Sequence, residues 1–201
     1  MKPRFVHDVS ALPDHAFGRD SILWWGTLGF MAIEGTGFIL AIAAYFYLMR
    51  EVPRWPPGTI PPPGPLYGSL LTAVLLVSAL PNHWAKQAGR RQDLRGSLLW
   101  MGVVLLLGAV ALVLRGFEFT TLNIRWDSNA YGSILWVLLG LHTTHLGTDV
   151  GDTAVLLAAL LRGHVTPRRF TDVTENCDYW YFVVLAWLPV YAVLYLVPRL
   201  S

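Results

Sequence analysis

Charged side chains are scarce in this sequence. Asp, Glu, Lys and Arg make up only 14% of its 201 residues, whereas hydrophobic residues make up 54%. Soluble domains usually carry roughly 25% charged residues. The formal net charge is +2, and membrane orientation accounts for the basic residues, so no charge pattern indicates a nucleic acid partner. The composition argues against an ordinary soluble domain and favours a membrane protein.

Cysteine is nearly absent, since Cys177 is the only one. A disulfide within the chain is therefore excluded, as is every Cys-x-x-Cys, Cys-x-x-Cys-His or paired-thiolate copper motif. We expect no covalent haem, iron–sulfur cluster or binuclear copper centre on this chain. The first twenty residues lack the apolar core of a signal peptide, so we expect the first span to be retained. The sequence also lacks an internal repeat, which gives little support to an inverted-repeat transporter.

Five long apolar stretches are the dominant feature. Each can cross a hydrocarbon core of ~30 Å, which takes about 20 helical residues. We predict an all-α fold, a polytopic membrane protein built as a bundle of five transmembrane helices. A cytoplasmic N-terminal segment, 1–21, precedes a transmembrane domain over 22–198. The predicted spans are 22–49, 66–87, 96–115, 130–161 and 177–198.

Basic residues are unevenly divided between the two sets of alternating segments. Ten of the fifteen Lys and Arg residues fall in one set and five in the other. The positive-inside rule assigns the richer set to the cytoplasm, so we expect the N-terminus inside and the C-terminus outside. The richer set is Lys2, Arg4, Arg19, Lys86, Arg90, Arg91, Arg95, Arg162, Arg168 and Arg169; the other is Arg50, Arg54, Arg115, Arg125 and Arg199.

Ionisable side chains lie at predicted mid-membrane depth in the first and fourth spans. Glu34 and His142 are each roughly 18 Å from the nearer end of their spans, at 1.5 Å rise per residue. A hydrogen bond from Glu34 to His142 or to His145 is therefore geometrically open. His142 and His145 share a helix face, and Asp149 and Asp152 continue it towards the cytoplasm. We predict a buried polar network of Glu34, His142, His145, Asp149 and Asp152.

Four interpretations of this network remain open. A haem with two histidine ligands needs histidines on facing helices, and only the fourth span has one at mid-depth. A carboxylate-bridged metal site uses Glu-x-x-His motifs, which are lacking. A proton relay needs a driving reaction, which this chain does not supply. The interpretation we favour is a polar contact between the first and fourth spans, followed by proton handling within a larger complex. We expect no catalytic, cofactor-binding or metal-binding residue here.

Five segments in chain order resemble subunit III of the haem–copper terminal oxidases, the cytochrome c oxidase subunit 3 family. "GFMAIEGTGFILAIAAYFYL" matches the helix with a mid-membrane glutamate, at Glu34. "RGFEFTTLNI" matches the glutamate-containing loop, at Glu118, and "GLHTTHLG" the histidine helix. The other two segments are "RWPPGTIPPPGPLYGS" and "YWYFVVLAW". The resemblance is to the short bacterial form, which has five helices and lacks the N-terminal pair of the longer form.

The resemblance implies an accessory, cofactor-free subunit in the bacterial inner membrane. It implies that the chain packs on catalytic subunit I, next to subunit II, with haem and copper in those partners. It also implies phospholipid binding, support of proton uptake during O2 reduction and protection of the enzyme during turnover. The contact with subunit I is expected at Trp180, Tyr181 and Trp187. By this resemblance His142 and His145 belong to a polar network and are not metal ligands.

The last helix departs from the family pattern. Tyr181 stands where the family usually has His, Val184 where it usually has Asp, and Thr174 where it has Glu, with Glu175 one residue away. Alternatives to a cytochrome c oxidase subunit therefore stay open. They are subunit III of a quinol oxidase, a subunit-III-like partner of nitric oxide reductase and, in a different class, a stand-alone proton-coupled transporter that uses Glu34 and the histidines.

Overall fold

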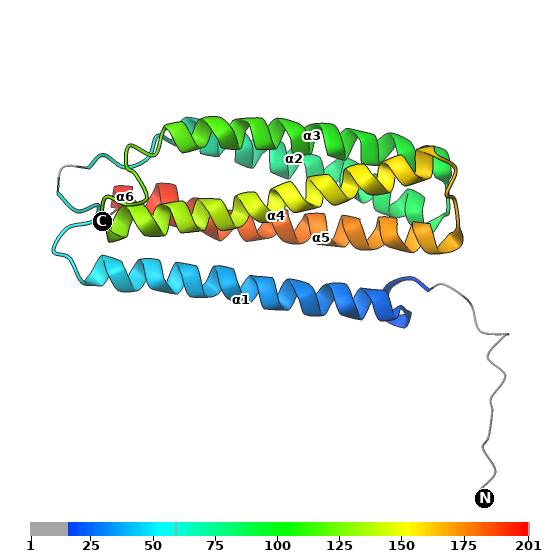
Figure 1. Ribbon diagram of the computed structural model, residues 1–201, viewed down its shortest axis with the longest axis horizontal. Helices are drawn as coiled ribbons and strands as arrows, with labels where there is room; N and C mark the ends of the chain where they lie inside the picture. Colours follow the sequence, from blue (N-terminus) through cyan, green and yellow to red (C-terminus); the bar gives the residue numbers. More distant parts are fainter. Residues whose placement is uncertain (1–15, 59, 201) are drawn as a thin grey trace, which may run out of the picture.

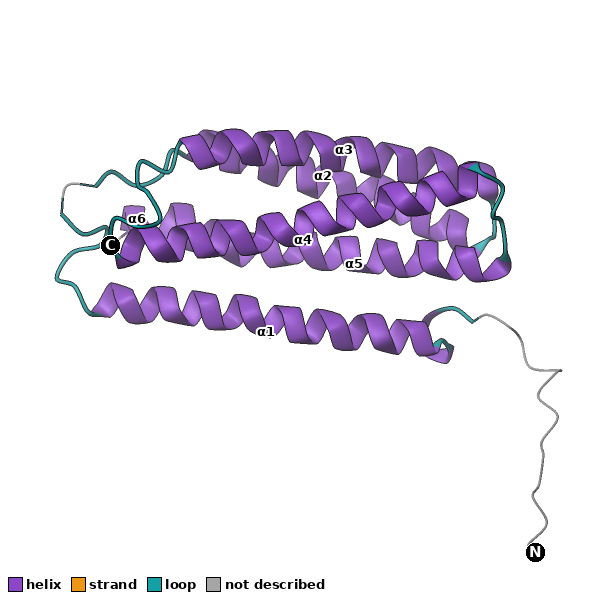
Figure 2. Cartoon of the chain, viewed as in Figure 1, coloured by secondary structure: helices purple, strands orange, loops and turns teal. Residues whose placement is uncertain are grey.

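The computed structural model describes residues 16–58 and 60–200, and this part of the chain is helical, with no strand. Five long helices lie side by side along one axis (Figures 1 and 2). A short 3-10 turn, η1, precedes them, and a π-helical segment, η2, and a last turn, α6, follow. Residues 1–15 of the predicted N-terminal segment, including Lys2 and Arg4, lie outside the described residues. The elements are η1 (Gly18–Asp20), α1 (Ile22–Arg50), α2 (Pro65–Arg90), α3 (Leu94–Thr120), α4 (Ala130–Leu161), α5 (Pro167–Tyr191), η2 (Ala192–Leu196) and α6 (Val197–Leu200).

Side-chain caps define where several helices begin. Ser21 accepts a hydrogen bond from the backbone N–H of Leu23 at the start of α1, and Asn129 accepts one from Gly132 at the start of α4. Thr166 caps α5, whose first residue is Pro167. Short polar side chains satisfy the free N–H groups of a first turn, and proline fits there because it has no N–H to leave unpaired.

Two helices extend beyond the predicted spans. α3 continues to Thr120, whereas the predicted span ends at 115, and α5 begins at Pro167 instead of 177. The apolar run sets the predicted boundaries, but a helix continues wherever its polar residues find partners. In α3 the partners lie inside the bundle, which changes the assignment of Arg115.

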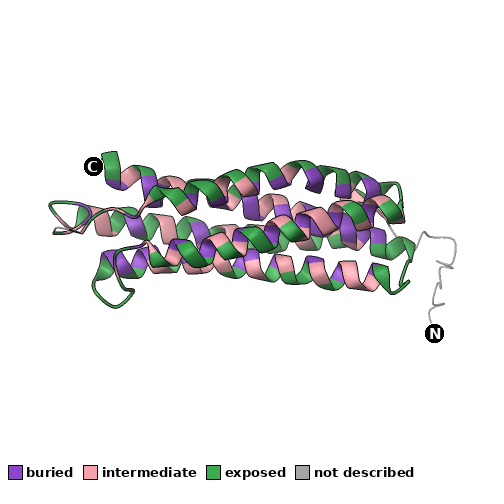
Figure 3. Cartoon of the chain, turned by 90° about the horizontal axis from the view of Figure 1, so that it is seen from above, coloured by how far each residue is buried: buried purple, intermediate pink, exposed green. Residues whose placement is uncertain are grey.

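The helices are not equally enclosed. α2 packs against α3 and α5, and α4 packs between α3 and α5, whereas α1 packs mainly against α4 and α5. Figure 1 shows α1 at the edge of the bundle, and its buried residues are Phe38 and Tyr45 alone. Figure 3 shows exposed positions along the whole length of the bundle. Apolar side chains such as Ile33 and Leu40 are exposed, as expected of a protein whose surroundings are lipid or another subunit.

Membrane-crossing potential differs among the helices. Within the described residues, α1, α2, α3 and the continuous stretch from α5 to α6 are long and apolar enough to cross a membrane. α4 has 32 residues, which is long enough, but it carries the polar stripe with His142, His145 and Asp149. α4 also contacts α1, α3 and α5. Its role as a fifth span remains a prediction that rests on this central place.

Polar contacts join α2 to α5 along their length. Because carbonyls, hydroxyls and indole N–H groups are costly to leave unpaired in an apolar interior, such pairs fix how the two helices align. Trp187 Nε1 donates to Thr72 Oγ1 (2.7 Å), Trp180 Nε1 to Ser78 Oγ (2.8 Å) and Asn82 Nδ2 to the Cys177 carbonyl (2.9 Å), and Lys86 pairs with Asp178.

Candidate functional site

Glu34 lies at the meeting point of α1, α4 and α5. Its Oε1 is 3.3 Å from His145 Nε2, and its Oε2 accepts a hydrogen bond of 2.7 Å from the Tyr179 hydroxyl. The Phe38 ring packs at 4.9 Å from the His145 ring, between centroids. Of the two pairings open to Glu34 from the sequence, the structure therefore has the one with His145. Through His145 and Tyr179, the Glu34 carboxylate connects α1 to α4 and α5.

The hydrogen bonds of His145 leave one proton position variable. Its Nδ1 is 2.6 Å from the Leu141 carbonyl oxygen, and because a carbonyl only accepts, Nδ1 carries a hydrogen. The remaining nitrogen, Nε2, faces Glu34. One proton can therefore reside either on His145 Nε2 or on the Glu34 carboxylate.

His142 belongs to a different cluster from His145. Its Nδ1 is 2.8 Å from Arg115 Nη2, and its Nε2 is 3.1 Å from the Val183 carbonyl oxygen. A guanidinium only donates and a carbonyl only accepts. Nδ1 is therefore the acceptor and Nε2 carries the hydrogen, so the fully buried ring is held as one neutral tautomer. The two histidines, three residues apart, have separate partners.

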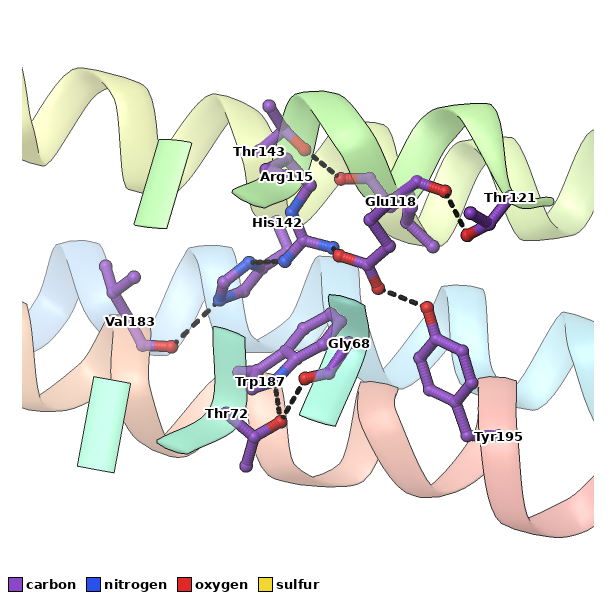
Figure 4. Close-up of polar contacts among 11 residues, drawn as sticks. Gly68, Thr72, Arg115, Glu118, Thr121, His142, Thr143, Val183, Trp187 and Tyr195 are labelled. Atoms are coloured by element: carbon purple, nitrogen blue, oxygen red, sulfur yellow. Dashed lines mark hydrogen bonds and ion pairs between the residues drawn. The ribbon is translucent and has the colours of Figure 1, made fainter. Parts of the chain in front are cut away.

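Arg115 is the centre of this second cluster (Figure 4). Its Nη1 donates to Glu118 Oε2 at 2.7 Å, and its guanidinium lies 4.1 Å from the centre of the Trp187 ring. The other oxygen of Glu118 accepts a hydrogen bond from Tyr195. Arg115 and Glu118 are 1% and 0% exposed. A buried ion pair of this kind is stabilised only when nearly all its hydrogen-bonding positions are used, and here α3, α4, α5 and η2 supply the partners.

This cluster overturns two expectations. From the sequence we expect Arg115 among the outer basic residues and Glu118 in an outer loop, whereas both lie inside α3 and inside the bundle. The spacing of residues along α3 does contain a signal for this placement. Buried positions of α3 recur three and four residues apart, as on one helix face, and the two charged residues continue that series. The buried residues of α3 are Ser97, Met101, Val104, Gly108, Ala111, Arg115 and Glu118.

The two aspartates of the predicted network have different surroundings. Asp149 is 2% exposed, and its Oδ1 accepts a 3.1 Å hydrogen bond from Asn176 on α5. Asn176 in turn accepts from Thr153. Asp149 Oδ2 is buried and accepts no hydrogen bond among the described residues. Asp152, by contrast, is exposed. The structure thus places Asp149 in an α4–α5 contact and Asp152 outside it.

A cleft of 790 Å³ is lined by the Glu34–His145 pair and by both aspartates. It lies between the first half of α1, the second half of α4 and the first half of α5, so it extends from the Glu34–His145 pair towards the end of the bundle where α4 turns into α5. Its carboxylate side chains are Glu34, Asp149, Asp152, Asp172 and Glu175. His142 does not line it.

The expected subunit contact at the last long helix needs correction. Trp180 and Trp187 are 1% and 0% exposed and donate to Ser78 and Thr72 of α2. Both indoles are therefore interior side chains of this chain and form no surface for another subunit. Tyr181 is half-buried and its hydroxyl lies 3.5 Å from the Ala79 carbonyl. Its contact with a neighbouring subunit remains a prediction.

The histidines use their nitrogens within the protein. Both ring nitrogens of His142 and of His145 face protein atoms. Over residues 16–58 and 60–200, no three His, Cys, Asp or Glu side chains come together as a metal-binding group. Cys177 has a buried free thiol, and its backbone carbonyl accepts a hydrogen bond from Asn82. In the described residues these groups therefore make contacts within the protein.

Comparison with known proteins identifies the family. A family model described as Cytochrome c oxidase subunit III matches residues 6–198. The chain is 27% identical over 196 residues to "Cytochrome c oxidase subunit 3" of Thermostichus vulcanus, covering 92% of each chain. It is 25% identical over 183 residues to the protein of that name from Synechocystis, covering 89% of this chain and 77% of the relative. The Gallus gallus protein is 27% identical over 179 residues, which cover 86% of this chain and 69% of that one. The chain belongs to the cytochrome c oxidase subunit III family.

Proposed function

We propose that this chain is the cofactor-free third subunit of a bacterial cytochrome c oxidase. In this role it packs on catalytic subunit I, next to subunit II, stabilises the complex and supports proton uptake on the cytoplasmic side during O2 reduction. Haem and copper reside in the partner subunits. The protein lies in the inner membrane with its N-terminus in the cytoplasm, and membrane phospholipid covers part of its exposed apolar surface.

The observation that carries this proposal is the engagement of both histidines by protein partners. A redox subunit needs ring nitrogens or thiolates free to bind a metal. Here His142 bonds Arg115 and Val183, and His145 bonds Leu141 and faces Glu34. Family membership supports the assignment to an oxidase complex, and the geometry supports an accessory role within it.

The exposed surface of α1 supports packing in a larger assembly. The helix buries only Phe38 and Tyr45 inside this chain, and large apolar side chains such as Phe30, Ile33 and Ile39 are more than half exposed. The relatives' name places them in an oxidase. Subunits and lipid together would cover this surface in the complex.

Purification from the native membrane tests the proposal. The tagged chain is isolated in a mild detergent, a reduced-minus-oxidised visible spectrum is recorded and the co-purifying chains are identified. We expect haem bands together with a large subunit I and a copper-binding subunit II. A haem-bearing complex without a copper-binding subunit would indicate a quinol oxidase or a nitric oxide reductase. A colourless chain that crosslinks to no partner in the membrane would refute the proposal and favour the transporter.

A further inference from the structure

The cleft between α1, α4 and α5 contains more carboxylates than its own cations balance. Five Asp and Glu side chains line it, and the basic groups along it are His145 and Arg169. Arg169 is already paired with Asp172, with Nη1 3.2 Å from Oδ2. His145 faces Glu34. Asp149, Asp152 and Glu175 thus have no cation among the lining residues.

Two of these carboxylates are deeply buried and have oxygens without a hydrogen-bond partner among the described residues, although Asp149 Oδ1 accepts from Asn176. Asp149 is 2% and Glu175 is 6% exposed. Asp149 Oδ2 and both oxygens of Glu175 accept no hydrogen bond among the described residues. The Thr27 hydroxyl faces Glu175 but donates to the Leu23 carbonyl at 3.1 Å. Leaving a buried acceptor unpaired is unfavourable, and more so for a charged group, so we expect a partner within the cleft for these oxygens.

Charges on α2 reduce the need for a counter-charge at Glu175 only in part. Lys86 and Arg90 act on Glu175 electrostatically, but so does Asp178, which also pairs with Lys86. Asp152 is the charged neighbour of Asp149. Adjacent carboxylates repel when both are ionised, so a proton is the smallest counter-charge that fits between them.

The size and lining of the cleft indicate what fills it. A volume of 790 Å³ holds many waters, each of which takes a share of about 30 Å³ in the liquid. Water occupies cavities that are polar and offer it two to four partners. Hydrocarbon tails cannot satisfy carboxylate oxygens, and the described residues contain no metal-binding group.

We propose that this cleft is a hydrated proton-binding chamber, whose carboxylates take up protons at the α4–α5 end of the bundle and pass them to the Glu34–His145 pair. Asp172 and Asp152 lie nearer that end, Glu175 and Asp149 follow, and Glu34 with Tyr179 closes the series. Each step moves one proton through water between oxygens or to His145 Nε2, with no redox change. The delivery to an oxidase rests on the proposed function, whereas hydration and proton binding do not.

Hydroxyl-radical labelling tests hydration on the unsubstituted protein. Radicals formed from water in the chamber oxidise nearby rings, and the fold supplies matched controls. His145 and Tyr179 line the cleft, whereas His142 and Tyr195 are buried in the Arg115 cluster. In the purified complex we expect His145 and Tyr179 to be oxidised several-fold faster than His142 and Tyr195. Equal slow oxidation of all four would overturn the proposal, as would native mass spectrometry showing an amine-bearing lipid seated in the cleft.

Infrared difference spectroscopy tests proton binding. Protonated carboxyl groups give a C=O band, and contact with water makes that band shift soon after transfer to D2O. We expect such bands, and we expect Asp149→Asn and Glu175→Gln each to remove part of the signal, whereas Asp127→Asn, an exposed residue paired with Arg125, leaves it unchanged. Bands that neither variant alters, or that do not shift in D2O, would refute the chamber.

Delivery is tested separately in the oxidase. A pH-sensitive dye follows proton uptake during a single turnover, and we expect Asp149→Asn to slow uptake several-fold while Asp127→Asn does not. Unchanged uptake, with labelling and infrared results as expected, would refute delivery but not hydration. If the chain proves to have no oxidase partner, the labelling experiment on the chain alone still decides whether the chamber exists.

Discussion

Arg115 Nη2 on α3 lies 2.8 Å from His142 Nδ1 on α4. Because arginine only donates, this contact makes Nδ1 an acceptor and fixes the neutral tautomer of the histidine, with its Nε2 hydrogen directed to the Val183 carbonyl. One guanidinium thereby connects three helices. Its charge is balanced by Glu118 alone among carboxylates within ion-pair distance in the described residues. We therefore expect the loss of either partner of the Arg115–Glu118 pair to destabilise the bundle.

Replacing Glu118 with Gln tests that pair. The substitution keeps the shape but leaves Arg115 as an uncompensated buried charge, and breaking such a pair costs about 3–5 kcal/mol. We expect the free energy of unfolding in detergent to fall by that amount, measured by denaturant titration.

Asp127→Asn is the matched control because it also removes the carboxylate of an ion pair with arginine. The Arg125–Asp127 pair is exposed, at 78% and 41%, and such pairs contribute ~0–1 kcal/mol. Equal losses of unfolding free energy in the two variants would show that the buried pair contributes no more to stability than the exposed pair.

The sequence predicts the helices well and the polar partners only in part. Long apolar runs predict five helices because burial in lipid needs about 20 such residues in a row, and the structure has five long helices. Which side chains meet depends on how helices rotate and where they end. Glu34 could be matched to a histidine by depth, but depth alone left His142 and His145 open. Only the packing of the helices decides the pairing: Phe38 packs against the His145 ring, and Glu34 faces His145 Nε2 while it accepts from Tyr179.

Arg115 shows why part of the site could not be found by composition. A charged residue considered alone indicates the end of a membrane span, because an unpaired charge in lipid is costly. Here Glu118, one turn later, cancels that charge inside the same helix, so the helix continues. Tyr195 and Trp187 complete the cluster from the far end of the chain, at a sequence distance that no local pattern reveals.

Replacing Glu34 with Ala should weaken the contact of α1 with α4 and α5. Tyr179 loses its acceptor and His145 loses its charged neighbour, which costs roughly 1–3 kcal/mol. Glu34→Gln should cost less, since its amide oxygen still accepts from Tyr179. Thermal unfolding and retention of the chain in the purified complex measure both. Full stability of the Ala variant would show that the pairing does not hold α1 in place.

Replacing Gly68 with Ala should disturb Tyr195 and, through it, Glu118. A Cβ at this position would lie 2.5 Å from Tyr195 Cε2, so the ring must shift away from the carboxylate that it bonds. Overpacking of this kind costs typically 1–3 kcal/mol. Gly102→Ala is the control, because nothing lies within 4 Å of its added Cβ. The thermal midpoint in detergent should fall for the first variant and stay level or rise for the second; a fall in both would point to a general intolerance of the helices.

The burial of Arg115 sharpens the expected orientation. With Arg115 inside the bundle, the end where α3 connects to α4 carries fewer exposed basic side chains. At the opposite end, Arg162, Arg168 and Arg169 are exposed. The positive-inside rule then favours a cytoplasmic α4–α5 turn more strongly. Because Cys177 is only 1% exposed, cysteines introduced at exposed Ser128 and His164 can be labelled in its presence. A membrane-impermeant maleimide should label Ser128→Cys in cells with an intact inner membrane, and His164→Cys only after that membrane is opened. The reverse order of labelling would invert the topology and place the α4–α5 end of the cleft on the outer side.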